Sequence, residues 1–162
     1  MIRNVIPEDA LCITEIYNYY IENTIITFET QKISEQEMSN RIENILNKNF
    51  PYIVFEDENK MIGYAYLNNW RNRAAYNITL ETSIYLDIKE TGKGYGKALY
   101  EALISEARKL EIHSLIGGIS LPNEPSRKLH EYFNFRLVGN FKESGSKFNQ
   151  LIDVEFWQLI LE

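Results

Sequence analysis

The stretch that decides the fold is Thr79-Leu-Glu-Thr-Ser-Ile-Tyr-Leu-Asp-Ile-Lys-Glu-Thr-Gly-Lys-Gly-Tyr-Gly-Lys-Ala-Leu99. Apolar and mostly polar side chains alternate along its first half, which is the period of a strand with one apolar face. One parity holds Ile78, Leu80, Ile84, Leu86 and Ile88, and the other holds Thr79, Glu81, Ser83, Tyr85 and Asp87. A turn rich in glycine and lysine follows and opens a helix. We therefore expect a strand, a tight turn and a helix in direct succession.

The turn has the composition of an anion-binding site. Gly92, Gly94 and Gly96 have no Cβ, so a ligand can approach the backbone closely and several amides can point the same way. The N-terminus of the following helix adds partial positive charge, and Lys93 and Lys97 add full charges. The turn is therefore suited to a phosphate, although a loop that needs glycine only for positive φ angles would look the same.

Two common nucleotide-binding motifs are excluded by the spacing of these residues. A P-loop ends in Gly-Lys-Ser or Gly-Lys-Thr, whereas Gly96-Lys97 is followed here by Ala98. A dinucleotide fingerprint has the spacing G-x-G-x-x-G, whereas the glycines here have the spacing G-x-G-x-G. Neither motif accounts for the turn.

The composition is that of one ordinary globular domain. The 162 residues are 44% hydrophobic and 25% charged, and this length can bury a sizeable core. The formal net charge of −6 argues against nucleic-acid binding, which needs an excess of Lys and Arg on one face. No apolar run approaches the ~20 residues that span a bilayer, and the N-terminus lacks the apolar region of a signal peptide, so we expect a cytoplasmic protein with no membrane partner. The single cysteine, Cys12, excludes an internal disulfide and a cysteine cluster for zinc, and we expect no metal.

The rest of the chain predicts a mixed α/β sheet around the opening stretch. Ser34 is the expected N-cap of the second helix, and Cys12 is expected in the apolar stripe of the first. The strands at 79–88 and 114–119 flank a helix, so they should be parallel neighbours. Residues 142–147 are expected to form the loop between the last two strands. We expect further strands at residues 1–6, 51–55, 60–67, 135–141 and 151–161, and further helices that begin at residues 7–9, 34 and 123.

In this order the parts resemble the GCN5-related N-acetyltransferases, the GNAT superfamily, over almost the whole chain. The acyl-CoA signature of that family is Gln or Arg, two residues, Gly, one residue, then Gly or Ala. It falls here on Thr91-Gly-Lys-Gly-Tyr-Gly96, with Thr91 in place of the usual Gln or Arg. Because backbone N–H groups supply most of the anion site, this departure affects one side-chain contact and leaves the amide cradle in place.

Further segments narrow the resemblance to the phosphinothricin N-acetyltransferase branch. Members of that branch acetylate the α-amino group of small amino-acid analogues such as phosphinothricin, methionine sulfoximine and methionine sulfone, and they commonly work as homodimers. The segments are Asn69-Trp-Arg-Asn-Arg-Ala-Ala-Tyr76, Thr79-Leu-Glu-Thr-Ser-Ile-Tyr85, Leu121-Pro-Asn-Glu-Pro-Ser-Arg-Lys-Leu-His-Glu131 and Asp153-Val-Glu-Phe-Trp-Gln158.

The resemblance implies a GNAT-type acyl-CoA N-acyltransferase fold, with a mixed α+β sheet, as a single domain over residues 1–162. It implies acetyl-CoA as co-substrate, a small-molecule amine as acceptor and a homodimer. Two alternatives stay open. One is acetylation of a protein N-terminus or a polyamine, and the other is a non-catalytic acyl-CoA-binding module.

The resemblance also implies roles for three side chains in the chemistry. Glu81 would be the general base that takes a proton from the amine, because a dry pocket could raise its pKa toward ~6–7; otherwise it is a solvated residue on a half-buried strand. Tyr132 could protonate the departing thiolate, or it could simply pack against the sheet. His130 could position the substrate or the base, or it could be a hydrogen-bonded structural group.

Binding residues follow from the same resemblance. Backbone groups of the strand would hold the pantetheine arm, the amides of the turn would hold the pyrophosphate, and the start of the last helix would contact the arm from a second side, unless Asn123 is only a helix cap. The expected acyl-CoA-binding residues are Ile84, Tyr85, Leu86, Gly92, Lys93, Gly94, Tyr95, Gly96, Lys97, Asn123 and Ser126. The candidates for the amino-acid pocket are Phe28, Trp70, Arg71, Arg73, Tyr76 and Lys147. The cationic candidates are included because a carboxylate or phosphinate needs a positive partner, although loop arginines are by default solvated and Phe28 could simply pack.

Overall fold

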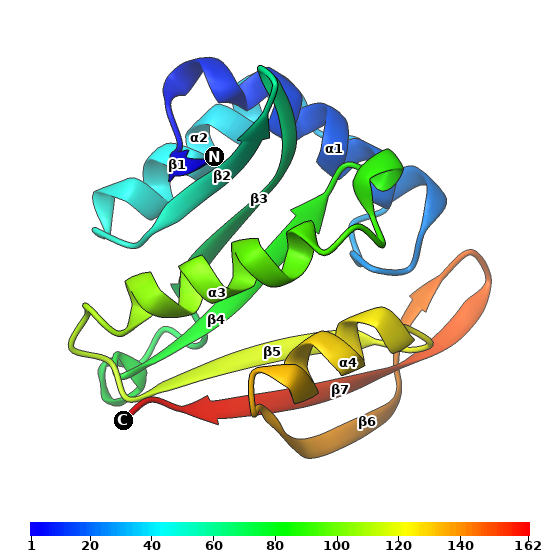
Figure 1. Cartoon of the computed structure of the whole chain (residues 1–162). Coiled ribbons are helices and arrows are strands. Elements are labelled where there is room, and N and C mark those ends of the chain that lie inside the picture. Colours follow the sequence, from blue (N-terminus) through cyan, green and yellow to red (C-terminus); the bar gives the residue numbers. More distant parts are fainter. The chain divides into compact units, whose positions relative to one another are not determined.

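A computed structural model describes all 162 residues and contains one mixed sheet of seven strands in the order β1-β2-β3-β4-β5-β7-β6, with four α-helices (Figure 1). This is the mixed α/β architecture that the sequence predicts. The contacts group the chain into two compact units. The first unit holds residues 1–18, 33–68 and 82–111, and the second holds residues 19–32, 69–81 and 112–162.

The first unit is built on three antiparallel strands. Strand β2 (Tyr52–Asp57) pairs with β1 (Ile2–Asn4) on one side and with β3 (Lys60–Asn69) on the other, so the predicted hairpin is confirmed. Its turn consists of Glu58 and Asn59, both with positive φ. Two helices cover opposite faces of β2, because Tyr52 and Ile45 of α2 (Glu35–Asn47) line the same small pocket, whereas Phe55 contacts Tyr95 of α3 (Tyr95–Ala107).

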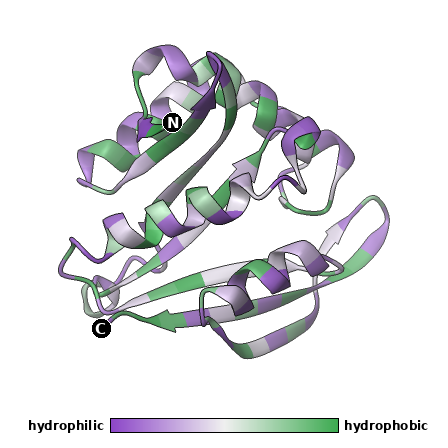
Figure 2. Cartoon of the chain, in the orientation of Figure 1, coloured by the Kyte–Doolittle hydropathy of each residue, from purple (hydrophilic) through white to green (hydrophobic).

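The helices follow the expected local signals, with one error. Ser34 caps α2 by accepting a hydrogen bond from the Glu37 amide at 3.1 Å, as predicted. Hydrophobic and hydrophilic residues alternate along α3 (Figure 2), and Leu99, Leu103 and Ala107 are fully buried. The prediction that Cys12 is a core residue of α1 (Ala10–Asn23) is wrong, because this side chain is exposed and the buried stripe of α1 passes beside it.

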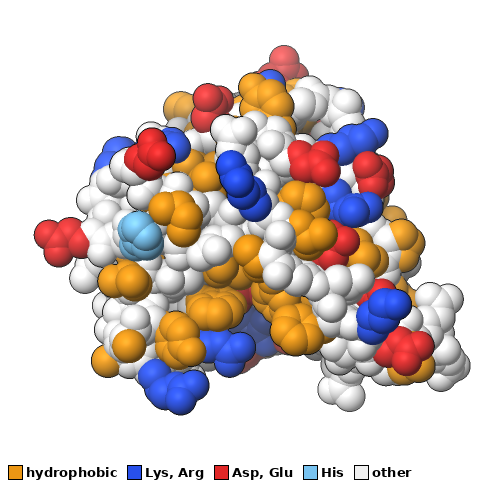
Figure 3. Space-filling view, turned by 90° about the horizontal axis from the view of Figure 1, so that it is seen from below, with side chains coloured by type: hydrophobic (Ala, Val, Ile, Leu, Met, Phe, Trp, Pro, Cys, Tyr) orange, Lys and Arg blue, Asp and Glu red, His pale blue; other side chains and the backbone are white.

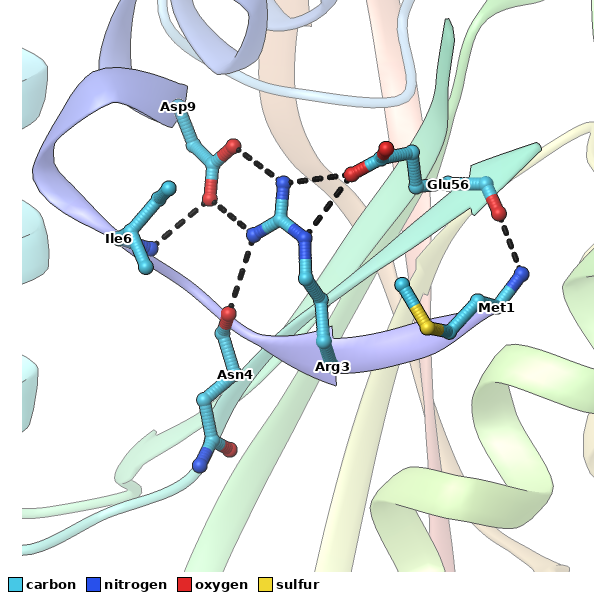
Figure 4. Close-up of polar contacts among 6 residues, drawn as sticks. All are labelled: Met1, Arg3, Asn4, Ile6, Asp9 and Glu56. Carbon is cyan, nitrogen blue, oxygen red and sulfur yellow. Dashed lines mark hydrogen bonds and ion pairs between the residues drawn. The ribbon is translucent and has the colours of Figure 1, made fainter. Parts of the chain in front are cut away.

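The N-terminal strand is fastened by a partly buried ion cluster (Figure 4). The Arg3 guanidinium donates to both carboxylate oxygens of Asp9 at 2.8 Å and to Glu56 at 2.9 Å. Asp9 also accepts from the Ile6 amide at 2.8 Å, and these hydrogen bonds outweigh burial and lower its pKa. The N-terminal ammonium of Met1 donates to the Glu56 carbonyl. This cluster holds β1 and the start of α1 to the edge of β2.

Strand β4 (Thr79–Leu86) has the predicted alternation only in its central part. Leu80 and Thr82 are buried, as the parity predicts, but Ile78 and Ile88 are exposed because they lie beyond the ends of the strand. Side chains on the other face of β4 are also partly buried near the end of the strand, where the Tyr85 ring contacts other tyrosine rings. β4 contributes residues to both units.

The second unit contains the parallel pairing of β4 with β5 that the sequence predicts. Strand β5 (Ser114–Ser120) runs parallel to β4 and antiparallel to β7 (Gln150–Ile160), and helix α4 (Glu124–Tyr132) packs on β5. Strand β6 (Arg136–Lys147) lies at the edge, antiparallel to β7.

The predicted loop at residues 142–147 is wrong. These residues continue β6, and a bulge between Phe141 and Gly145 absorbs the irregular part of the sequence. The chain reverses instead at Phe148 and Asn149, which both have positive φ, 53° and 58°. Two consecutive residues of positive φ are the geometry of a two-residue hairpin turn, and such turns usually contain glycine. The absence of glycine at the turn explains why the sequence pattern pointed elsewhere.

Candidate active site

The glycine turn is an open cradle at the start of α3. Gly92 and Gly94 have φ angles of 77° and 88°, and Gly94 is the left-handed N-cap of the helix. A Cβ on either glycine would meet no atom within 4 Å, so glycine is required here by the backbone conformation and not by crowding. The first amides of an α-helix have no partner within the helix, so the turn presents N–H groups to an exposed surface. Exposed amides at a helix N-terminus are a general feature of anion-binding sites.

Thr91 does not supply a contact to that surface. Its hydroxyl donates to the Ile88 carbonyl at 2.9 Å and closes the short 3₁₀ turn Ile88–Glu90 that precedes the glycines. The side chain that replaces the usual Gln or Arg of the signature therefore shapes the turn from inside.

Charged side chains gather beside the cradle around Glu90. The ammonium groups of Lys60 and Lys93 donate to its two carboxylate oxygens at 2.7 and 2.8 Å, and together they lower the pKa of Glu90 to about 2. Lys60 also pairs with Asp87 at 3.3 Å. Lys60 comes from the β2–β3 hairpin, and no local pattern in the sequence connects it with the glycine turn.

The strand residues expected to hold the pantetheine arm lie at the end of β4. The Tyr85 ring is stacked on Tyr64 with centroids 5.5 Å apart and meets Tyr17 edge-on at 5.2 Å. Gly63 on β3 allows the close approach, since a Cβ there would lie 3.0 Å from the Leu86 Cα. Ile84, Tyr85 and Leu86 are all half-buried.

Glu81 lies on one face of the sheet in the second unit. Its register partner is Ile116 on β5, and Gly118 follows two residues later, opposite Phe156 of β7. Side chains of register partners share a face and alternate along a strand, so Glu81, Ile116, Gly118, Ser120 and Phe156 lie together. We call this surface the Glu81 face.

Glu81 is a half-buried carboxylate close to β5 and to an aromatic ring of β7. A Cβ on Gly118 would lie 3.6 Å from the Glu81 Oε1 and 3.5 Å from the Phe156 ring, so the glycine leaves space between carboxylate and aromatic ring. Burial raises the pKa of Glu81 above its ordinary value of 4.5. Gly118 and Phe156 were not among the predicted site residues, although a Gly-Gly pair inside a strand is a known signal of close approach.

His130 lies on the opposite face of this sheet. It belongs to α4, and its ring occupies the position that a Cβ on Gly117 would need. The Nδ1–H donates to the Ser126 carbonyl at 2.7 Å, and burial lowers the pKa of the imidazole. Gly117 and Gly118 alternate across the sheet, so the structure does not bring His130 and Glu81 together.

The two ends of α4 carry the other predicted residues. Asn123 is the N-cap, and its Oδ1 accepts from the Ser126 amide at 3.2 Å, so the capping interpretation is confirmed. Tyr132 is the last residue of the helix, and its side chain is 57% exposed and meets Phe133 edge-on.

The loop before β4 forms a small cluster of rings and cations. Trp70 and Tyr76 meet edge-on with centroids 5.4 Å apart. The guanidinium of Arg71 lies 4.7 Å from the Trp70 ring centre, and that of Arg73 lies 5.7 Å from the Tyr76 ring centre. The structure therefore brings these four predicted residues together as cation–π pairs, with both guanidinium groups exposed.

Phe28 and Lys147 also come together, through the segment between α1 and α2. The Phe28 ring covers Gly145 of β6, where a Cβ would overlap it. Lys147 as a residue is 4% exposed, and its ammonium donates to the Thr27 carbonyl at 2.8 Å. Lys147 thus binds a backbone group of this segment.

No three potential metal-ligating side chains converge anywhere in the structure, and none of the helices combines the length and apolar character needed to cross a bilayer.

Known proteins resemble this chain over nearly its whole length. The family model of the acetyltransferase (GNAT) domain matches residues 2–156. The L-methionine sulfoximine/L-methionine sulfone acetyltransferase of Salmonella typhimurium is 30% identical over 161 residues, which are 99% of this chain and 94% of that protein.

Solved structures share the fold. A GNAT superfamily phosphinothricin acetyltransferase from Sinorhizobium meliloti, in complex with acetyl-CoA, has a TM-score of 0.97 at 37% identity and covers 99% of this chain and 88% of its own. A ribosomal-protein-alanine N-acetyltransferase from Brucella melitensis has a TM-score of 0.98 at 32% identity and covers 99% of both chains.

Proposed function

The chain belongs to the GNAT family of acetyltransferases, and from this premise we propose that it acetylates the α-amino group of a small amino acid or amino-acid analogue. Acetyl-CoA is the acetyl donor of this enzyme class. Acceptors of the phosphinothricin, methionine sulfoximine and methionine sulfone type are supported by the names of two relatives. The observation that carries the proposal is a half-buried carboxylate with a raised pKa on the Glu81 face.

In this proposal Glu81 is the general base. An α-amine has a pKa of about 8 in model peptides and attacks a thioester only in its neutral form, so a group must take its proton. Burial raises the pKa of Glu81 above its ordinary value, which makes it a stronger base than an ordinary glutamate. The carboxylate accepts the proton, directly or through water, as the new N–C bond forms.

The glycine turn would hold the donor's pyrophosphate. The turn residues from Gly92 to Lys97 offer backbone amides and the positive end of α3, and the ammonium of Lys93 is held at the same place by Glu90. Backbone groups of Ile84, Tyr85 and Leu86 would hold the pantetheine arm. Acetyl-CoA supplies the activated acetyl group as a thioester.

Tyr132 would protonate the thiolate when the C–S bond breaks, which its exposed position at the end of α4 allows. Asn123 and Ser126 would contact the arm from the start of the same helix. We assign His130 the role of fixing α4 on the sheet, because its ring packs over Gly117 and its Nδ1–H donates to the Ser126 carbonyl within α4.

Acceptor recognition would fall to the loop before β4. The exposed guanidinium groups of Arg71 and Arg73 would bind the acceptor's carboxylate or phosphinate, with Trp70 and Tyr76 holding them in place. Phe28, which covers Gly145, would line the acceptor site on the Glu81 face.

One structural relative favours a second candidate. The Brucella melitensis protein is named for ribosomal-protein-alanine acetylation, which is the modification of a protein N-terminus. A binding module without catalysis is the third possibility, and the position of Glu81 counts against it.

A thiol-release assay with a panel of amines separates these candidates. The wild-type protein would be given acetyl-CoA with methionine sulfone, phosphinothricin, a polyamine and a peptide that begins with alanine. We expect turnover on the two amino-acid analogues and little on the others. Turnover only on the peptide would support N-terminal acetylation, and acetyl-CoA binding without turnover on any amine would support the module.

We further propose that the two units form one acetyltransferase domain, since the family match spans residues 2–156, and that the enzyme is a homodimer. A cytoplasmic location stays a prediction of the sequence.

A further inference from the structure

The segment 24–30, between α1 and α2, is fastened to the Glu81 face. Ser120 lies on that face two residues after Gly118, and its hydroxyl donates to the Ile25 carbonyl at 2.7 Å. Thr24 and Thr27 order the segment from inside, because their hydroxyls accept from the amides of Ile26 and Glu29 at 3.1 and 3.4 Å. The segment therefore has a defined backbone shape and is bonded to the Glu81 face at Ser120.

Strand β6 provides two further contacts to the same segment. Gly145 pairs with Ile152, and Lys147 pairs with Gln150. Both partners share the parity of Phe156 on β7, so Gly145 and Lys147 also belong to the Glu81 face. Phe28 covers Gly145, and the Lys147 ammonium donates to the Thr27 carbonyl.

The burial of Lys147 is the unusual feature. Lysine side chains ordinarily extend their ammonium group into water, and burial of a charged group is costly unless polar partners compensate. Here the side chain is 4% exposed, its ammonium bonds a backbone carbonyl, and the Phe148 ring centre lies 5.2 Å away. An ammonium kept in such a place fixes the position of that carbonyl.

We propose that Lys147 is a positioning residue for the amine acceptor, which holds segment 24–30 in its binding shape over the Glu81 face before the acceptor arrives. This inference rests on the proposed function. It assigns Lys147 an indirect role, in place of the direct contact with the acceptor that the sequence suggested. Preorganisation of this kind lowers the entropy lost when the acceptor binds. We expect it to act on the acceptor side, because segment 24–30 contains none of the residues proposed to hold acetyl-CoA.

The test compares Lys147→Met with Lys147→Arg, and uses Lys142→Met as the matched control on an exposed position of the same strand. For Lys147→Met we expect the KM for methionine sulfone to rise about tenfold, since one hydrogen bond to a charged group is lost. The KM for acetyl-CoA should change less than about twofold. Lys147→Arg, which keeps a cationic donor, should recover most of the loss, and Lys142→Met should behave as the wild type.

Amide hydrogen exchange without ligands gives a readout that does not depend on activity. Segment 24–30 should exchange about tenfold faster in Lys147→Met than in the wild type. Faster exchange with an unchanged KM for methionine sulfone would overturn the positioning role, and so would an equal rise of both KM values. Absence of turnover by the wild type on every amine would instead overturn the proposed function, while unchanged exchange would show that Lys147 does not hold the segment.

If Lys147→Met fails to fold, Ser120→Ala removes the second fastening at Ile25. The same selective rise in the KM for methionine sulfone is then expected, and an unchanged value would overturn the proposal.

Discussion

At the scale of single residues, the sequence identified candidate site residues but not the residues that surround them in the fold. Glu81 could be selected from the family resemblance, but its neighbours Gly118 and Phe156 come from two other strands. His130 could not be placed on either face of the sheet, because its position depends on the absence of a Cβ at Gly117. Lys147 was a candidate for the acceptor pocket because of its charge, and its hydrogen bond to the Thr27 carbonyl could not be foreseen because it joins residues far apart in the sequence.

The raised pKa of Glu81 predicts a pH-dependent cost in stability. The folded protein binds a proton at Glu81 more tightly than the unfolded chain does. The contribution of this protonation to the free energy of unfolding is therefore complete below the ordinary pKa of 4.5. It is lost as the pH rises through the pKa of Glu81 in the folded protein. Glu81→Gln should therefore gain stability relative to the wild type between about pH 4 and about pH 7. Thermal unfolding of both proteins at the two pH values measures this, and an equal difference in Tm at both would contradict it.

At the scale of elements, the local signals for helix starts and periodicity were strong enough to place most boundaries. Ser34 and Asn123 both cap helices as predicted, because the capping hydrogen bond is local in sequence. The hairpin of β6 and β7 was misplaced, since Phe148 is an uncommon residue for a turn with positive φ. Residues 142–147 have the composition of a loop, but Gly145, Ser146 and Lys147 pair with β7 beyond the bulge that follows Phe141.

The left-handed cap of α3 predicts a specific sensitivity to alanine. Gly94→Ala should lower the free energy of unfolding by roughly 1–2 kcal/mol, because the cost is backbone strain at a φ of 88° and not a collision. It should also weaken acetyl-CoA binding, because the strained turn moves the amides. Urea unfolding and calorimetric titration with acetyl-CoA measure the two effects.

Gly139→Ala is the matched control for Gly94→Ala. A Cβ there also meets nothing within 4 Å, and Gly139 is not among the positive-φ residues, so stability should change by less than about 0.5 kcal/mol. Equal effects of the two substitutions would show that the left-handed conformation of Gly94 does not matter.

At the scale of the whole molecule, the parallel pairing of β4 with β5 followed from the strand, helix and strand between residues 79 and 119. The order of the last two strands could not be predicted in this way, because β7 lies beside β5 and β6 lies at the edge of the sheet. Composition also gave no sign of the apolar residues left exposed on these strands. Figure 3 shows hydrophobic side chains among charged ones on one face of the molecule, and Phe141 and Leu151 are 60% and 64% exposed.

The proposed homodimer is tested by mass in solution. Sedimentation at micromolar concentration should give twice the 19.1 kDa of one chain. A mass of one chain at every concentration examined would contradict the dimer and leave the acetyltransferase proposal in place.

The central claim is that acetyl transfer depends on the carboxylate of Glu81. Its most direct test is the kcat of Glu81→Gln for methionine sulfone at saturating acetyl-CoA, with acetyl-CoA affinity measured in parallel to show that the donor site is intact. We predict a fall in kcat of about 10²-fold or more with nearly unchanged affinity, because glutamine keeps the shape of the side chain but cannot accept the proton. A kcat close to that of the wild type would contradict the claim.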